Sequence, residues 1–322
     1  MGSFRLILKP MRFELLAMIG ASIAVLAAAM YVMVDIGRLG DMTTCLRQQD
    51  AFQDIYSAGC NAKLETFLRL RHGEAQQVMD FMRLLPLVVG IVLGVPVVGR
   101  EIEAGTAPLA WSLAGSRERW LAGRLLRVAL VVVVILIPIA VVSDVLESRL
   151  EPTLSVGASF VDWGSRGFPL IAYGLIALAI AVAAGALVGR TLPAILLAGL
   201  LCLLLYQGAH PLMRRALRPQ AVDLSANYLT LPPAEAQELA NAALSFGVVA
   251  YDPDGNPIDD LSAWIEAHQA DMQQGRVPTT IPIGLPGSRY LEVELLESGA
   301  LLAGALFASI VAGVITRRRA PY

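Results

Sequence analysis

Long apolar runs separated by polar segments dominate the pattern of this chain. A helix that crosses a bilayer needs about 20 apolar residues, because lipid offers no hydrogen-bond partners to the backbone. Six runs fit this requirement, at 14–34, 84–99, 125–146, 168–189, 192–208 and 295–315. The second run is short on its own, but 78–83 can extend it by more than a turn. We therefore predict an all-α integral membrane protein with six transmembrane helices.

The composition agrees with this pattern. Apolar residues make up 56% of the 322 residues, and the mean hydropathy is +0.62. The net charge of −2 and the lack of a basic tract argue against a nucleic-acid partner. The three cysteines and three histidines show no metal-ligand spacing, so we expect no metal site.

The start of the chain allows more than one interpretation. Basic residues precede the first run and Ala27–Ala29 resembles a cleavage site, but the apolar stretch is longer than in a typical signal peptide. We predict that it is retained as a membrane span. The preceding residues, 1–13, alternate apolar and basic positions and are predicted to form an interfacial helix, the alternative being a merely basic tail.

The distribution of basic residues predicts the orientation. With the N-terminus in the cytoplasm, 12 of the 25 Lys and Arg lie in the inside segments, and 13 lie in outside segments about three times as long. This is the bias that the positive-inside rule describes. The tail at 316–322 then also lies inside, and we predict a multi-pass protein of a plasma membrane, of bacterial type, with both termini cytoplasmic.

Two outside segments are sizeable, in addition to a shorter one at 147–167. The first, 35–83, contains Cys45 and Cys60, which would face an oxidising compartment. The spacing alone leaves open a disulfide or two unpaired thiols, and we predict the disulfide. The second, 209–294, is predicted to form a cap over the outer mouth.

Within this cap we expect helices at 233–243 and 262–274. The aspartates between them, beginning at Asp252, could suggest calcium, but the terminal Glu of an EF-hand is absent. We therefore predict a turn at Asp254-Gly255.

Small residues recur at four-residue spacing within the runs. Gly185 and Gly189 form one such pair, and Gly304 and Ala308 form another. This spacing permits close contact between helices, although simple richness in Ala and Gly would produce it too.

The most informative segment is 100–124, the only long segment on the predicted inside. Glu101 and Glu103 lie near the end of the second span, and Gly105 permits a sharp turn. Thr106 can cap a second helix, in whose first turn Pro108 is tolerated. The pattern predicts a short helix across the cytoplasmic surface, with apolar and aromatic area from Leu109, Trp111, Leu113 and Trp120.

This segment resembles the signature of type-2 ABC transporter permeases, the ABC-2 exporter family. That family shows Glu-x-Glu-x-Gly-Thr, a Leu-rich helix, a Ser-Arg or Thr-Arg pair and a basic residue at the start of the third span. The residues that match it without gaps are Glu101, Glu103, Gly105, Thr106, Ser116, Arg117, Gly123 and Arg124. Leu109-Ala110-Trp111 fits an actinobacterial-like branch. The departures are Ala114-Gly115, where Pro is frequent, and Arg124, where Lys is usual.

The resemblance implies a transport subunit without a catalytic site of its own. It would pair with a second permease copy, most simply in a homodimer, and with an ABC ATP-binding subunit that binds ATP and Mg. Glu101 and Glu103 would contact that subunit, and Gly105, Thr106 and Arg117 would shape and anchor the coupling helix. The cargo would be a drug, peptide or lipid of amphipathic or lipophilic character.

Two other functions remain possible from the sequence. A membrane sensor or scaffold could read the outside through its two large loops, although the coupling-type segment argues against it. An intramembrane enzyme would need polar catalytic groups within the spans, and the candidates Glu14, Asp144 and Glu297 all lie near span ends.

Overall fold

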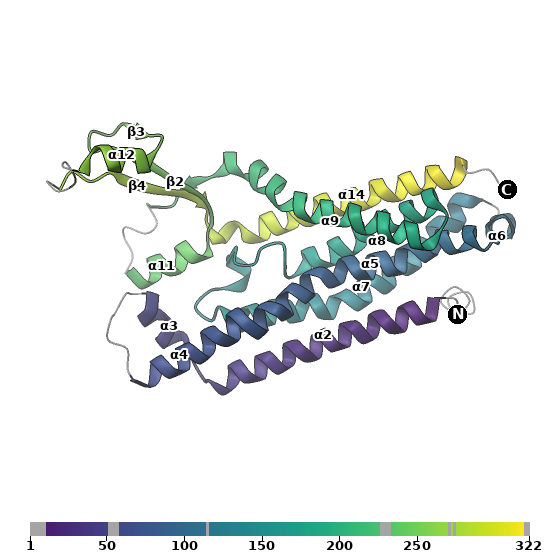
Figure 1. The fold of residues 1–322 in the computed structure, drawn as a ribbon, viewed down its shortest axis with the longest axis horizontal. Helices are drawn as coiled ribbons and strands as arrows, with labels where there is room; N and C mark the ends of the chain where they lie inside the picture. The colour runs from purple at the N-terminus through teal and green to yellow at the C-terminus, as the bar shows by residue number, and fades with distance from the viewer. Residues whose placement is uncertain are drawn as a thin grey trace.

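The computed structural model describes residues 11–50, 58–113, 116–225, 233–269, 272 and 275–318. Residues 1–10 of the predicted interfacial helix and 319–322 of the predicted tail lie outside the described residues. Figure 1 shows a long bundle of roughly parallel helices with a small sheet at one extremity. We call the extremity with the start of α2, the end of α14 and α6 the terminal end, and the opposite one the cap end.

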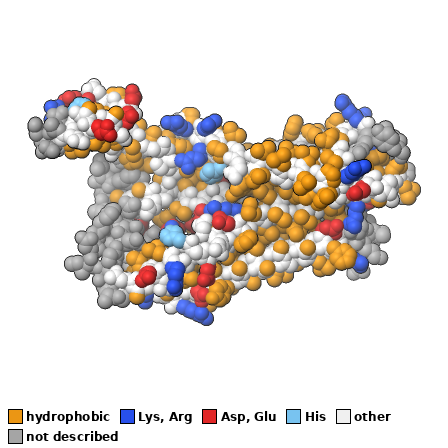
Figure 2. Space-filling view, in the orientation of Figure 1, with side chains coloured by type: hydrophobic (Ala, Val, Ile, Leu, Met, Phe, Trp, Pro, Cys, Tyr) orange, Lys and Arg blue, Asp and Glu red, His pale blue; other side chains and the backbone are white. Residues whose placement is uncertain are grey.

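Six helices of the described residues are long and apolar enough to cross a membrane. They are α2 (Arg12–Arg38), α5 (Gln76–Glu103), α7 (Arg117–Leu150), α8 (Phe168–Val188), α9 (Thr191–Leu217) and α14 (Tyr290–Arg318). Hydrophobic side chains form a broad band across the face in Figure 2, and charged side chains gather on either side of it. This is the surface of a membrane protein, as predicted.

The helices reach beyond the predicted spans at the cap end. A short π-helical turn, Arg71–Ala75, joins α4 (Ala58–Leu70) to α5, so that Cys60–Glu103 forms one helical segment of 44 residues. Such a segment is roughly 66 Å long, about twice the thickness of the hydrocarbon core. The predicted loop 35–83 is therefore largely helical, and it also contains α3 (Thr43–Asp50).

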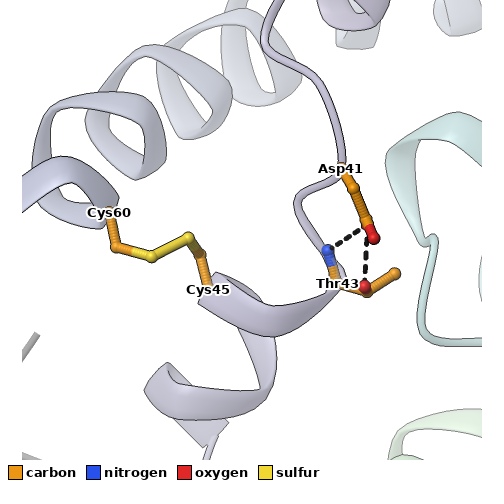
Figure 3. The surroundings of a disulfide bond; sticks show 4 residues. All are labelled: Asp41, Thr43, Cys45 and Cys60. Atoms are coloured by element: carbon orange, nitrogen blue, oxygen red, sulfur yellow. Dashed lines mark hydrogen bonds between the residues drawn. A yellow bond between two sulfur atoms is a disulfide. The ribbon is translucent and has the colours of Figure 1, made fainter. Parts of the chain in front are cut away.

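A disulfide fixes the start of this helical segment. Cys45 in α3 and Cys60 in α4 are joined, with their Cα atoms 5.6 Å apart (Figure 3). Asp41 Oδ1 accepts hydrogen bonds from the Thr43 backbone N–H at 2.9 Å and from its hydroxyl at 2.7 Å. The disulfide and the hydrogen bonds of Asp41 hold α3 in place between α2 and α4.

The centre of the bundle is α8, which is mostly buried and packs against α5 and α14. The contact with α5 is close because glycines face it. A Cβ at Gly90 would lie 2.5 Å from the Gly174 carbonyl oxygen, and one at Gly94 would lie 2.6 Å from the Ala181 Cβ. The short distance between α5 and α8 is therefore possible only with small residues at these positions.

The small residues singled out from the sequence have different roles. A Cβ at Gly185 would lie 2.9 Å from the Val95 carbonyl oxygen, and one at Gly304 would lie 2.9 Å from the Ile176 Cδ1. Gly189 instead ends α8 in the left-handed conformation, at φ +70°. Gly90 and Gly94 of α5 have the same four-residue spacing, in a helix that also contains Pro86 and Pro96, but they were not singled out from the sequence.

The cap contains a four-stranded antiparallel sheet, so the prediction of an all-α chain is wrong here. The strands lie in the order β1 (Val222–Asp223), β4 (Thr279–Leu285), β2 (Leu244–Tyr251) and β3 (Pro257–Ile258). The helices α11 (Pro233–Ala242) and α12 (Leu261–Ala267) flank β2 and β3 in sequence, close to the predicted helices; residues 270–271 and 273–274 of the second prediction lie outside the described residues. The pairing of β2 with β4 joins segments separated by a helix, which local patterns do not reveal.

The predicted turn closes β2 onto β3. The Asp252 carboxylate accepts hydrogen bonds from the backbone N–H groups of Asp254 and Asn256, and Gly255 adopts φ +87°. The Asn256 side chain also donates to this carboxylate, and these bonds hold the pKa of Asp252 below its usual value. Within the described residues, no group of acidic, His and Cys side chains has the arrangement of a metal site.

Candidate functional site

The predicted coupling segment forms a sharp turn followed by a short helix at the terminal end. α5 ends at Glu103, Gly105 adopts φ +70°, and α6 runs over Ala107–Leu113 (Figure 1). The backbone N–H of Thr106 donates to the Glu101 carbonyl at 3.0 Å, which closes the end of α5. A side chain at Gly105 would strain this conformation, which explains why glycine occurs here.

A polar clamp holds the exit of α5 against the entry of α7. Arg124 donates to Glu101 Oε1 at 2.7 Å and to the Val97 carbonyl at 3.2 Å. The Thr106 hydroxyl, predicted to cap α6, donates to Glu101 Oε2 at 2.6 Å. Both charged side chains are largely buried, so the clamp is better shielded from water than a surface ion pair. It fixes the base of the turn that carries α6.

Aromatic and cationic side chains brace α6 on α7. The rings of Trp111 and Trp120 meet edge to face with centroids 6.3 Å apart. The guanidinium of Arg117 lies 4.5 Å from the Trp111 ring centre, and that of Arg124 lies 4.6 Å from the Trp120 ring centre. α6 therefore buries the Trp111 side and exposes Leu109, whose side chain is 65% exposed.

Glu103 connects the same turn to another span. Its carboxylate accepts hydrogen bonds from the Thr191 hydroxyl and from the Thr191 backbone N–H, the latter at 2.9 Å. Thr191 is the first residue of α9, where backbone N–H groups have no partner within the helix and a negative charge is favourable. Thr191 was not among the predicted site residues, because a contact across 88 positions leaves no local signal.

Two further contacts tie the segment to the outer helices of the bundle. Arg117 Nη1 donates to the carbonyls of Thr316 and Arg317 at the end of α14, at 3.4 and 3.2 Å. Arg100 pairs with Glu14 near the start of α2, at 3.2 Å. The five predicted residues, Glu101, Glu103, Gly105, Thr106 and Arg117, thus lie in one region and contact α7, α9 and α14 within the chain.

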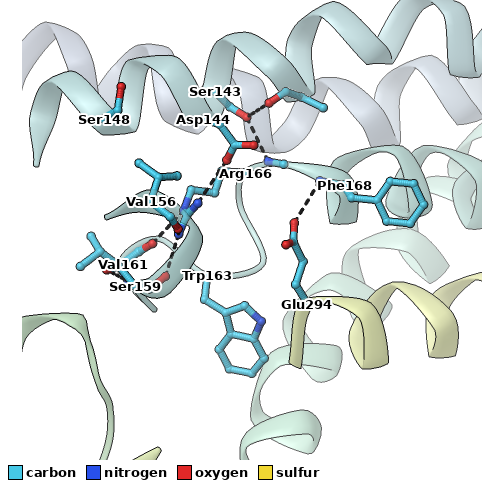
Figure 4. Close-up of polar contacts among 12 residues, drawn as sticks. Ser143, Asp144, Ser148, Val156, Ser159, Val161, Trp163, Arg166, Phe168 and Glu294 are labelled. Carbon is cyan, nitrogen blue, oxygen red and sulfur yellow. Dashed lines mark hydrogen bonds and ion pairs between the residues drawn. The ribbon is translucent and has the colours of Figure 1, made fainter. Parts of the chain in front are cut away.

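A second polar cluster lies at the cap end, around Arg166. This side chain, only 1% exposed, pairs with Asp144 of α7 at 3.1 Å (Figure 4). It also donates to the backbone carbonyls of Val156, Ser159 and Val161, at 2.7–3.1 Å. The loop between α7 and α8 is folded around this one guanidinium. The guanidinium also lies 4.4 Å from the ring centre of Tyr290, the first residue of α14, so the cluster contacts that helix too.

Neighbouring groups complete this cluster. The Ser143 hydroxyl accepts a hydrogen bond from the Gly167 backbone N–H, and Glu294 accepts one from the Phe168 N–H at the start of α8 (Figure 4). The structure thus ties α7, α8 and α14 together by polar contacts next to the cap. The sequence pattern indicated none of these contacts.

Comparison with known proteins identifies one family. A family model described as "ABC-2 membrane transporter related" matches residues 15–215, which include α5, α6, α7 and α8 and nearly all of α2 and α9. No curated protein and no solved structure matches the chain.

Proposed function

Because the chain belongs to the ABC-2 membrane transporter related family, we propose that it is the membrane-spanning permease subunit of an ATP-driven exporter. Its six long apolar helices fit such a subunit. The cargo would be an amphipathic or lipophilic molecule, such as a drug, peptide or lipid, moved out of the cytoplasm or the inner leaflet. The terminal end would face the cytoplasm of a bacterial-type cell and the cap end would face outside.

The observation that carries the proposal is the bracing of α6. A helix of seven residues has little stability of its own. Here the clamp of Glu101, Arg124 and Thr106, together with the two tryptophans, holds it at the tip of α5 and α7. A braced helix that exposes an apolar side chain at the end of two spans is suited to dock into a partner and pass its displacement on.

The partner in this proposal is an ABC ATP-binding subunit, which would bind ATP and Mg and supply the energy. A second permease copy, most simply an identical one, would complete the transporter. Glu101 and Glu103 were predicted to contact the ATP-binding subunit directly. Since both carboxylates are engaged within the chain, we propose that they act chiefly by positioning α6 and α9.

The test is co-purification of the tagged chain from its native membrane in a mild detergent. We expect an ATP-binding subunit with the wild type and a severalfold lower yield with Leu109→Ala, because burying a leucine at an interface is worth about 1.5–3 kcal/mol. Leu126→Ala is the matched control, since Leu126 is 73% exposed but lies within α7. It should leave the yield unchanged.

The outcomes separate the two leading functions. If no ATP-binding subunit appears in several mild detergents, the exporter has no energy source and a membrane sensor or scaffold becomes the better interpretation. If the subunit appears but Leu109→Ala behaves as Leu126→Ala does, the permease function stands and α6 is not the docking element.

A further inference from the structure

An apolar groove of about 600 Å³ runs along the bundle between α7, α8 and α14. Its lining includes the buried side chains of Leu121, Leu178 and Ala179, which form the floor. It also includes Leu126 and Leu306, which are more than half exposed and form the lips. All three helices are long and apolar enough to cross a membrane, so the groove opens to lipid and not to water.

The groove has the length of one leaflet of a bilayer. Its lining runs from Glu118 to Ala129 along α7 and from Leu302 to Gly313 along α14, whereas α8 contributes residues only from its middle third, between 175 and 179. Each of the two longer stretches extends roughly 17 Å, at about 1.5 Å per residue, and the hydrocarbon core is about 30 Å thick. The groove therefore reaches from the terminal end to the middle of the membrane, which is the path of one acyl chain.

Charged side chains surround the mouth of the groove at the terminal end. Glu118 lines the groove and pairs with Arg317 of α14 at 3.6 Å. These side chains are 63% and 77% exposed, and a pair so exposed contributes little stability, so Arg317 can exchange this carboxylate for another anion. Arg119 and Arg318, next to them in sequence, are exposed as well. Three arginines thus accompany one glutamate at the level of the lipid headgroups.

This charge favours a phospholipid over a second copy of the chain as the occupant. A second copy packed here about a two-fold axis would bring the same arginines of both copies together, and like charges repel. A phosphate, by contrast, is an anion whose geometry the guanidinium fork matches. Basic pockets between membrane helices at the membrane surface bind anionic headgroups for the same reason.

We propose that the groove binds one phospholipid of the leaflet at the terminal end, with an acyl chain between α7, α8 and α14 and the phosphate at Arg317. The lipid bridges α7 and α14, which the contacts of Arg117 with the end of α14 already join at the same level. The inference goes beyond the proposed function, because the site is separate from α6 and from the path of a cargo.

The test is binding of dioleoylphosphatidylglycerol to the delipidated, detergent-purified chain, followed by native mass spectrometry as the lipid is titrated. The phosphate is the only charge of this lipid, so no headgroup amine can pair with Glu118. Two further probes separate the parts of the ligand, because dioleoylglycerol has the chains without the phosphate and glycerol 3-phosphate has the phosphate without the chains. We expect the first phosphatidylglycerol to bind at least about fivefold more tightly than dioleoylglycerol and at least about tenfold more tightly than glycerol 3-phosphate.

Gly313→Leu tests whether the groove is the site. Gly313 lines the groove and nothing lies within 4 Å of a Cβ placed there, so a leucine fits on the helix and takes up part of the groove. Gly299→Leu is the matched control, since Gly299 lies in the same helix with equally open space but does not line the groove. We expect Gly313→Leu to weaken phosphatidylglycerol binding about fivefold or more, and Gly299→Leu to leave it within about twofold of wild type.

Two variants at the mouth should act in opposite directions. Arg317→Gln removes the partner of the phosphate and should weaken phosphatidylglycerol binding about fivefold. Glu118→Gln removes the carboxylate that competes for Arg317 and should strengthen binding about twofold or more. Binding of dioleoylglycerol should respond to neither variant. All variants are compared at equal monodispersity and thermal midpoint, and Ala129→Leu, which fills the groove from α7, replaces Gly313→Leu if that variant does not fold.

The proposal is overturned if phosphatidylglycerol binds no more tightly than dioleoylglycerol, if Gly313→Leu binds it as Gly299→Leu does, or if Glu118→Gln weakens binding. The last result would mean that the carboxylate, and not Arg317, holds the ligand. Loss of a dimer in Gly313→Leu at unchanged lipid binding would assign the groove to a second copy instead. The assay needs no ATP-binding subunit, so its outcome does not depend on co-purification of that subunit.

Discussion

Replacing Arg166 by Met would remove the charge at the centre of the cap-end cluster while keeping most of the side-chain volume. The chain offers a matched comparison, because two Arg–Asp pairs have nearly equal distances. Arg166 and Asp144 are 3.1 Å apart, and Arg276 and Asp254 are 3.2 Å apart. They differ in burial, since Arg166 is 1% exposed and the Arg276 side chain is 55% exposed.

The expected magnitudes follow from burial and from the number of bonds. Removing one member of a fully buried ion pair costs about 3–5 kcal/mol, but here the remaining Asp144 side chain is 42% exposed and water can solvate it, so losing the pair itself costs less. Arg166→Met also leaves three buried or half-buried loop carbonyls without their charged donor, at about 1–3 kcal/mol for each that stays unsatisfied, so we place the total loss at about 3 kcal/mol or more. Arg276→Met should cost less than about 1 kcal/mol, as is usual for an exposed pair.

The assay measures the thermal unfolding midpoint of the detergent-purified wild type and of both variants, with intrinsic fluorescence as the signal. Arg166→Lys serves as an intermediate, because it keeps the charge but cannot donate to all four acceptors at once. We expect the highest thermal midpoint for Arg276→Met, a lower one for Arg166→Lys and the lowest for Arg166→Met. Equal midpoints for the two methionine variants would refute the argument that burial, and not distance, determines what the Arg166 pair contributes.

Two further predictions concern the packing of the bundle. Reduction of the bond between Cys45 and Cys60 should lower stability by about 3 kcal/mol, the value for a closed loop of about 15 residues. A reductant should therefore lower the midpoint of wild type and of Cys202→Ser, but not that of Cys45→Ser. Gly90→Ala should cost about 1–3 kcal/mol because its Cβ would meet α8 backbone, whereas Gly299→Ala, with nothing within 4 Å, should not lower the midpoint in the same assay.

The sequence revealed those features that are encoded locally. Apolar runs of about 20 residues identify spans, and Gly105 after two acidic residues identifies the turn before α6. What the sequence could not reveal depends on distant residues. The pairing of β2 with β4, the Glu103–Thr191 contact and the contact of Arg166 with Tyr290 each join positions that no local periodicity relates.

The functional signature itself shows this limit. The positions of Glu101 and Glu103 were enough to suggest a coupling element, but not to show what the carboxylates contact. Glu101 is bound by Arg124, 23 positions away, and Glu103 by Thr191, 88 positions away. A motif of acidic residues that resembles a docking surface can therefore be a set of internal connectors, and the exposed Leu109 of α6 becomes the better candidate for contact with a partner.

The contact of Glu103 with Thr191 links the terminal end of the molecule to helices that extend to the cap end. Glu103 belongs to α5 and Thr191 begins α9, so a displacement of α6 is imposed on both helices together. The same two helices line a cavity of about 480 Å³ at the cap end, through Arg83 of α5 and through Tyr206 and His210 of α9. α14, by contrast, is tied to the start of α7 by Arg117. Movement of α5 and α9 relative to α7 and α14 would therefore change the shape of the cap-end cavity, because the first two helices supply part of its lining and the last two supply none of it.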